Sequence, residues 1–265
     1  MSKTALISIN TSWNIYHFRA GLMAALRSAG YRIVSAAPKD AYTQRLIGNV
    51  DRHITLPMDN AGTSPLNDML LFFRYYQLLR REKPSVLLSY TIKPNIYGAL
   101  AARIVGIPVI ANVSGLGTAF IRESWLTRVV CLLYRVAFRH VACVFFQNPE
   151  DRRLFIARRL VAAERAHVLP GSGVDLDYFS PRPSLRHAQE PFAFVLIARL
   201  LWDKGIGEYV AAARRVKATH PGTRFRLVGP RAVRNQTAIT DAQIDAWVAE
   251  GVIDYLGEIE DLRDV

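Results

Sequence analysis

The sequence predicts an α/β protein with parallel sheets covered by helices, in two domains of which the second is incomplete. Short β-branched and aliphatic runs alternate with longer stretches of helical periodicity along nearly the whole chain, which is typical of strand-helix-strand units. The alternation stops once, where prolines and glycines cluster, and then restarts. With 265 residues, 51% of them hydrophobic, the chain is long enough to bury a full core.

The first predicted domain spans residues 1–170, and each of its strands leads into turn residues or a helix. Because parallel neighbours need crossover connections, this succession favours one parallel sheet. The expected strands are Ala5–Asn10, Arg32–Ala36, His53–Leu56, Ser85–Ser89, Pro108–Val113, Val141–Gln147 and His167–Leu169. The expected helices are Ile15–Ala29, Tyr42–Gly48, Leu66–Glu82, Ile96–Val105, Leu126–His140 and Glu150–Leu160.

Residues 171–186 are expected to form a linker, because glycines and prolines interrupt every apolar period there. A second domain over residues 187–265 then repeats the alternation. Its expected strands are Phe192–Ile197, Arg224–Val228 and Val252–Leu256, and its expected helices are Gly207–Thr219 and Asp241–Glu250. Such a unit is half of a doubly wound sheet, and these units bind mononucleotides at the carboxyl ends of their strands.

Charge, cysteine content and hydropathy exclude several classes of protein. The net charge is +12; residues 1–185 hold 23 basic and 11 acidic side chains, whereas residues 186–265 hold 11 of each. Cys131 and Cys143 lie in apolar runs without ligand spacing, so neither a disulfide framework nor a structural zinc is expected. The N-terminus has no secretory-signal features, and arginines interrupt the longest apolar region, Trp125–Phe146, so no membrane span is expected.

Two cations five residues apart mark the loop Ile197–Gly205, which joins the end of a predicted strand to a helix start. The guanidinium of Arg199 can bind two oxygens of a diphosphate, and Lys204 adds a point charge. The helix N-terminus supplies free N–H groups. The spacing alone leaves open that both are ordinary solvated loop residues.

Two loops of the first domain also follow predicted strands. Ser89–Asn95 carries hydroxyl, ammonium and amide groups where open α/β sheets bind ligands, although Thr and Asn are also ordinary helix caps. The Gly115-Leu-Gly117 loop lacks the third glycine of a dinucleotide fingerprint, and Glu123 comes too soon to be the ribose acid. This loop is expected to let a ligand or a partner domain approach the backbone, and the alternative is a plain tight turn.

No metal or nucleophile pattern is convincing. Asp175-Leu-Asp177 lies in the expected linker, where turn-forming aspartates are favoured over a metal motif. The six histidines show neither metalloprotease spacing nor a Ser or Cys nucleophile signature beside them, so a hydrolase triad is not expected.

Two helices have a composition suited to a lipid surface. Leu66–Glu82 is apolar with interspersed arginines, and Trp125–His140 projects Arg128, Arg135 and Arg139 from one face. An apolar helix with an arginine stripe can lie in an anionic lipid interface; the alternative is packing on the sheet with the arginines in water.

Taken together, these segments resemble glycosyltransferase family 4, retaining enzymes with two Rossmann-like domains that face each other across a cleft (the glycosyltransferase B-type fold). The resemblance covers essentially the whole chain. It is closest to bacterial enzymes that extend lipid-diphosphate-linked saccharides, such as N-acetylgalactosaminyltransferases of glycan assembly and capsule or O-antigen enzymes. The strings that carry it are Tyr90–Tyr97, Asn112–Phe120, Phe146–Asp151, Leu169–Asp175, Ala198–Gly205 and Tyr255–Gly257.

The resemblance implies transfer of a sugar, with retention, from a UDP-type nucleotide sugar to a lipid-diphosphate-linked saccharide. It implies that Arg199 and Lys204 bind the donor diphosphate and that Gly257 and Glu258 lie near the nucleobase. The residues implied on the acceptor side of the cleft are Thr91, Lys93, Asn95, Gly115 and Gly117. No metal or other cofactor is implied, since cations and helix ends neutralise the leaving diphosphate.

The resemblance also implies partners and a place in the cell. The expected partners are the nucleotide sugar, the lipid-linked acceptor and an anionic membrane surface, with no nucleic acid, at the inner face of the bacterial cytoplasmic membrane. The family carries a pair of glutamates beyond the point where this sequence ends, which implies a partial or truncated chain. The alternative function is therefore a non-catalytic membrane-surface module that binds lipid-linked glycan.

Overall fold

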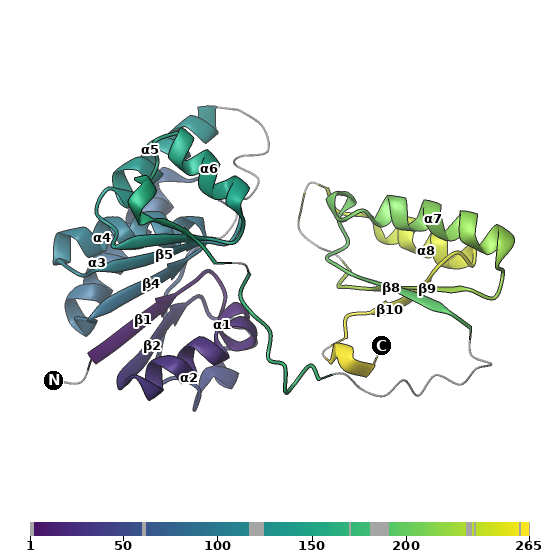
Figure 1. The fold of residues 1–265 in the computed structure, drawn as a ribbon, viewed down its shortest axis with the longest axis horizontal. Helices are drawn as coiled ribbons and strands as arrows, with labels where there is room; N and C mark the ends of the chain where they lie inside the picture. The colour runs from purple at the N-terminus through teal and green to yellow at the C-terminus, as the bar shows by residue number, and fades with distance from the viewer. Residues whose placement is uncertain are drawn as a thin grey trace. The chain divides into compact units, whose positions relative to one another are not determined.

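The computed structural model describes residues 3–59, 62–116, 125–169, 171–180, 191–231, 235, 237–259 and 261–264. The chain forms two compact units, Met1–Asp175 and Leu176–Val265, and each unit has its own sheet (Figure 1). The boundary between the units lies within residues 171–186.

The first unit contains a seven-stranded parallel sheet in the order β3-β2-β1-β4-β5-β6-β7. Its strands are β1 (Lys3–Ser8), β2 (Tyr31–Ala37), β3 (Arg52–Thr55), β4 (Val86–Tyr90), β5 (Val109–Val113), β6 (Cys143–Phe146) and β7 (Ala166–Val168). Each strand predicted for this domain is confirmed. The strand order reverses between β1 and β4, and open α/β sheets bind ligands at such a switch point.

Helices cover both faces of this sheet (Figure 1). On one face, α1 (Ser12–Phe18) and α2 (Ala20–Ser28) pack on a core that contains Ala5 and Ile7. The other core contains Leu6, because successive side chains of a strand point to opposite faces. The helices over this second core are α3 (Pro65–Glu82), α4 (Ala99–Val105), α5 (Trp125–Phe138) and α6 (Pro149–Ala157).

The predicted helix Ile15–Ala29 is wrong as a single element, because the structure divides it at Arg19. The hydroxyl of Thr11 accepts a hydrogen bond from the backbone N–H of Asn14 at 3.2 Å, and this cap starts α1 earlier than expected. Arg19 then leaves helical geometry with φ −119° and ψ 4°, and α2 begins at Ala20. The side chain of Arg19 becomes buried, with only 6% of its surface exposed.

The predicted helix Tyr42–Gly48 is also wrong, since only a 3₁₀ turn forms at Gln44–Leu46. Local side-chain bonds compete with the helix. The carboxylate of Asp40 accepts a hydrogen bond from the backbone N–H of Tyr42 at 2.9 Å, and the hydroxyl of Thr43 accepts one from Asp40 N–H at 2.9 Å.

The second unit contains a three-stranded parallel sheet in the order β10-β9-β8. Its elements are β8 (Ala193–Ile197), α7 (Ile206–Thr219), β9 (Arg224–Val228), α8 (Asp241–Ala249) and β10 (Asp254–Gly257). Both helices lie on one face of the sheet (Figure 1). The predicted alternation is confirmed. β10 starts later than expected, because the backbone N–H of Val252 still bonds to the carbonyl of Trp247 in α8 at 3.2 Å.

Candidate functional site

The carboxyl edge of the second sheet is a loop system that presents two cations. After β8 the backbone N–H of Ala198 bonds to the carbonyl of Val228 at 3.0 Å, so Arg199 lies just beyond the strand end. A 3₁₀ turn at Trp202–Lys204 then leads to Gly205, whose φ of +74° suits glycine, and to α7. The chain between the cations is anchored, because Leu200 and Leu201 are 1% and 3% exposed.

Gly229 brings the three strand ends together. A Cβ atom at this position would lie 2.0 Å from the carbonyl oxygen of Ala198, so only glycine fits without a backbone shift. The N–H of Gly229 also bonds to the carbonyl of Gly257 at 2.8 Å. Arg199 and Gly257 therefore lie on loops that both contact the same glycine.

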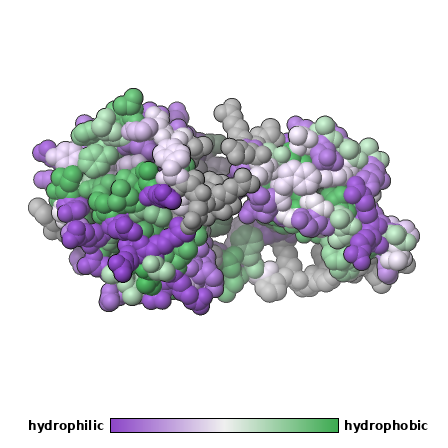
Figure 2. Space-filling model, turned by 90° about the horizontal axis from the view of Figure 1, so that it is seen from above, coloured by the Kyte–Doolittle hydropathy of each residue, from purple (hydrophilic) through white to green (hydrophobic). Residues whose placement is uncertain are grey.

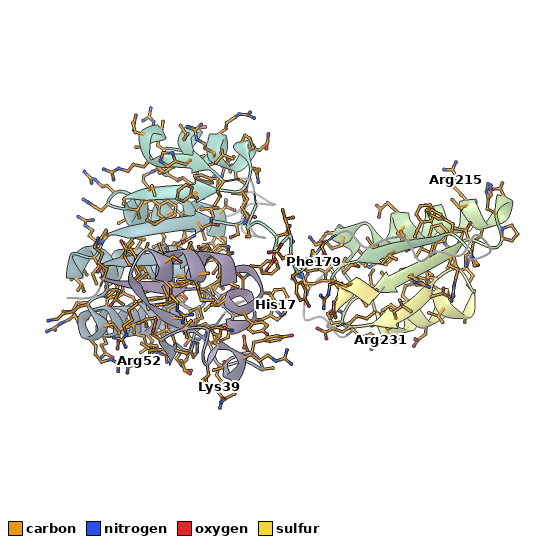
Figure 3. The ribbon with its side chains drawn as sticks, turned by 60° about the horizontal axis from the view of Figure 1, so that its bottom comes forward. His17, Lys39, Arg52, Phe179, Arg215 and Arg231 are labelled. Atoms are coloured by element: carbon orange, nitrogen blue, oxygen red, sulfur yellow. The ribbon has the colours of Figure 1, made fainter. Side chains whose placement is uncertain are left out.

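The side chains of Arg199 and Lys204 are exposed and form no hydrogen bond or ion pair within the described residues. Glu258, beside Gly257, is exposed too. Arg231 is a third cation at this edge, but it is held in place, with its guanidinium 4.7 Å from the ring of Tyr255 and 2.7 Å from a carboxylate oxygen of Asp245 (Figure 3). Arg199 and Lys204 are thus available to an anionic ligand.

The loop after β4 in the first unit is strained. Thr91 has a φ of +67°, which is unfavourable for a β-branched residue. A π-helical turn at Pro94–Gly98 follows it and runs into α4. Left-handed non-glycine residues and π turns both occur preferentially at functional sites, so this loop is a candidate part of a site.

Asn95 is completely buried and holds this loop to the sheet. Its amide oxygen accepts a hydrogen bond from the hydroxyl of Ser89 at 2.8 Å, and its amide nitrogen donates to the carbonyl of Asn112 at 2.8 Å. Tyr134 of α5 bonds to the same side chain. These contacts indicate that Asn95 holds the loop after β4 in position against the sheet.

Lys93 forms an ion pair with Asp68, which lies in the first turn of α3, at 2.8 Å. Both side chains are largely buried, at 15% and 18% exposed. The hydroxyl of Tyr97 donates to the other carboxylate oxygen of Asp68 at 2.8 Å, and together with burial this bond raises the pKa of Tyr97. The three residues tie the start of α3 to the loop after β4.

Gly115 follows β5 with a φ of +148°, and a Cβ atom there would meet no atom of the described residues within 4 Å. Gly117, the second glycine predicted for this loop, lies outside the described residues.

Sequence reasoning missed an aromatic cluster on α1. The rings of Trp13, Tyr16, His17 and Phe18 lie next to one another. The ring centre of Tyr42 lies 5.0 Å from that of His17, which is labelled in Figure 3. The described residues contain no group of His, Cys, Asp and Glu side chains arranged to hold a metal ion.

Two helices of the first unit expose apolar stripes at helical spacing. Figure 2 looks onto the face where α5 and α6 lie uppermost in Figure 1, and it shows hydrophobic residues gathered among hydrophilic ones. None of the helices in the described ranges combines the length and hydropathy that a bilayer span requires. The stripes consist of Leu66, Met69, Leu70 and Phe73 on α3 and of Trp125, Val129, Leu132 and Val136 on α5, each 41% to 75% exposed.

Residues 18–171 match the model of the glycosyl transferase 4-like domain family, which is more than half of the chain. The chain belongs to this family. It is 26% identical over 267 residues to a Campylobacter jejuni N,N'-diacetylbacillosaminyl-diphospho-undecaprenol alpha-1,3-N-acetylgalactosaminyltransferase, covering 95% of this chain and 69% of the relative.

Two further likenesses agree with this assignment. An Escherichia coli UDP-Gal:alpha-D-GlcNAc-diphosphoundecaprenol alpha-1,3-galactosyltransferase is 27% identical over 186 residues, which is 65% of this chain and 47% of that protein. The crystal structure of Anabaena HepE in complex with UDP-glucose superposes with a TM-score of 0.72 at 18% identity, covering 97% of this chain and 69% of that one. The predicted glycosyltransferase B-type α/β fold is confirmed.

Proposed function

We propose that this chain acts in transfer of a sugar from a UDP-linked donor to a lipid-diphosphate-linked saccharide, with retention, in bacterial surface polysaccharide or glycan assembly. The observation that carries the proposal is the exposed pair Arg199 and Lys204 on an anchored loop at the carboxyl edge of a mononucleotide-binding sheet. The two relatives named above act on diphospho-undecaprenol-linked acceptors by their names, which supports the choice of acceptor class.

In this proposal the loop neutralises the diphosphate that leaves as the glycosidic bond breaks. Arg199 binds two phosphate oxygens, and Lys204 contributes a point charge. The attraction of both cations to the diphosphate becomes stronger once the bound ligand excludes water. These cations take the part that a metal ion has in other sugar-nucleotide enzymes, so the transfer is proposed to need no metal. Gly257 and Glu258 are proposed to lie beside the nucleobase, because their loop contacts the Gly229 loop next to Arg199.

The acceptor is proposed to bind at the loops after β4 and β5. Thr91 and Gly115 are the residues assigned to it, with Gly117 as a member outside the described range. Lys93 is proposed to support this loop through its ion pair with Asp68. Asn95 serves these loops by holding them to the sheet, since its amide bonds to the hydroxyl of Ser89 and to the carbonyl of Asn112 inside the fold. Access to a lipid-linked acceptor requires the chain to reach a membrane surface.

An anionic bilayer is the proposed surface. The apolar stripes of α3 and α5 provide side chains that can enter the interface, and the excess of basic residues lies within residues 1–185. Arg128 and Arg139 of the predicted arginine stripe are exposed beside α5's apolar residues, whereas Arg135 donates to the carbonyls of Arg158 and Arg159. The proposed location is the inner face of the cytoplasmic membrane.

A transfer assay tests the proposal. Radiolabelled UDP-sugars are offered to the purified chain together with a polyprenyl-diphosphate-linked saccharide, and the lipid fraction is extracted and counted. Label in the lipid that disappears in Arg199→Ala and persists in Arg215→Ala, an exposed arginine on α7, supports the transferase. Acceptor binding without transfer of label supports the alternative function, a non-catalytic module that binds lipid-linked glycan, and contradicts turnover by this chain.

A further inference from the structure

Arg19 is a buried cation at the carboxyl edge of the first sheet that the proposed transfer does not use. It lies at the break between α1 and α2 and is 6% exposed. Its guanidinium carbon lies 4.1 Å from the ring centre of Tyr90, the last residue of β4. Since β1 and β4 are the strands between which the order reverses, Arg19 lies at the switch point of the sheet.

The contacts that Arg19 makes with the described residues are uncharged. Nη1 donates to the hydroxyl of Ser172 at 3.1 Å, and Nη2 donates to the amide oxygen of Asn14 at 3.3 Å. Within the described ranges the buried Nε has no hydrogen-bond partner, and no carboxylate forms an ion pair with this guanidinium.

The site therefore retains one positive charge. Burial lowers the pKa of Arg19, but a guanidinium starts so high that it stays protonated. Burial raises the pKa of Tyr90, so its hydroxyl remains neutral and does not act as a counter-ion. A buried charge without a counter-ion is costly, and the contact with the ring of Tyr90 recovers only part of that cost. A bound anion would offset the rest of that cost.

We propose that Arg19 binds a phosphate group of a ligand at the switch point of the first sheet. The planar fork of a guanidinium matches phosphate oxygens, and the buried Nε is one of the donors still available. Ser172 is exposed, and its oxygen accepts hydrogen bonds from Arg19 and from Gln147 Nε2 at 3.3 Å, so its own hydrogen is available to an anion. The phosphate site is inferred from the contacts of Arg19 alone, and only the choice of a diphosphate as its ligand rests on the proposed function.

Calorimetric titration with inorganic pyrophosphate at low salt tests this site. The parent is the full chain with Arg199→Ala and Lys204→Ala, so that the cations of the second unit do not bind the probe. Adding Arg19→Met is expected to weaken binding at least tenfold, and adding Arg19→Lys is expected to weaken it several-fold, because the fork is lost while the charge stays. Arg27→Met, an exposed arginine on α2, is the matched control and is expected to leave binding unchanged.

Thermal melting separates binding from folding. Arg19→Met removes a buried uncompensated charge, so its melting temperature is expected to be no lower than that of the parent. Pyrophosphate is expected to raise the melting temperature of the parent and not that of Arg19→Met. If Arg19→Met does not fold, the pyrophosphate affinity of Arg19→Lys is the deciding measurement. Parent-like affinity in every Arg19 variant that folds overturns the site.

Two ligands identify the source of the phosphate, with the second unit's cations restored. If Arg19→Lys weakens binding of a short polyprenyl diphosphate and not of UDP, the site belongs to the acceptor; the reverse assigns it to the donor. If neither ligand is affected, a diphosphate of the donor or the acceptor is contradicted as the ligand of this site. The pyrophosphate titration requires neither UDP binding nor sugar transfer. Its result can therefore be interpreted even if the proposed function is wrong.

Discussion

The two units hold their edge residues in opposite ways. In the first unit Asn95 is fully buried with its bonds satisfied, and Lys93 is paired with Asp68. In the second unit Arg199 and Lys204 are exposed, and backbone hydrogen bonds together with the buried side chains of Leu200 and Leu201 fix their loop. A buried, bonded side chain organises its neighbours, whereas an exposed cation is free for a ligand. Substitutions of Asn95 and Lys93 are therefore expected to reduce stability, and those of Arg199 and Lys204 to reduce ligand binding.

Asn95→Ala is expected to have the largest effect on stability. It leaves the hydroxyls of Ser89 and Tyr134 and the carbonyl of Asn112 without their buried partner, at a cost on the order of 3 kcal/mol. Urea unfolding measures it, with Asn67→Ala on the exposed side of α3 as the control, expected within about 0.5 kcal/mol of the parent. A small change for Asn95→Ala would remove the contrast between the units.

Gly229→Ala tests whether packing fixes the second edge. The added Cβ meets the carbonyl oxygen of Ala198, so a backbone shift is forced, with a cost of about 2 kcal/mol and weaker UDP binding. Gly222→Ala is the matched control, since a Cβ there meets nothing within 4 Å. Equal stability and equal UDP affinity in the two variants would show that the strand ends are not locked together.

The apolar stripes give a smaller expected effect. Phe73→Ser on α3 and Leu132→Ser on α5 should each weaken co-sedimentation with anionic vesicles by about 1 kcal/mol, because each removes a half-exposed apolar side chain from the interface. Ile104→Ser, equally exposed but on α4 and outside both stripes, is the control. Binding to neutral and anionic vesicles that is equal at low salt would contradict an electrostatic surface.

His53 gives the smallest expected effect, in the pH dependence of stability. Burial lowers its pKa below the ordinary 6.5, and its Nε2 is buried without a partner. The neutral side chain of His53 therefore stabilises the fold above pH 6.5, and the free energy of unfolding falls as the pH drops below this value. The reason is that His53 binds a proton more readily in the unfolded chain than in the folded protein. Denaturant midpoints between pH 7.5 and about 5 should fall less steeply in His53→Gln than in the parent; identical slopes would argue against it.

Much of this fold was predictable because buried parallel strands leave apolar runs that turn residues interrupt. The helix break at Arg19 was not, since an arginine in a helical pattern normally lies on the surface and its φ and ψ values leave no sequence signal. The short turn at Gln44–Leu46 was missed because Asp40 and Thr43 bond to nearby backbone, a competition that apolar periodicity does not register.

The residues of the candidate site could be predicted where they lie close together in the sequence. Arg199 and Lys204 lie five residues apart in one loop between a predicted strand and a predicted helix, and this spacing indicated a diphosphate site. Asp68 and Arg19 act through partners far along the chain, at Lys93 and Ser172, so only the fold brings them to the edge of the sheet. Gly229 carries a weak signal, a Gly-Pro pair directly after an apolar strand, that sequence reasoning could have used.

The exposed cations of the second unit are proposed to bind a nucleotide diphosphate. Calorimetric titration of UDP into the full chain measures this binding. Arg199→Ala and Lys204→Ala are each expected to lose about 1.5 to 3 kcal/mol of binding free energy, roughly tenfold or more in affinity, with unfolding midpoints unchanged. UDP affinity that is the same in both variants as in the parent would contradict the proposal.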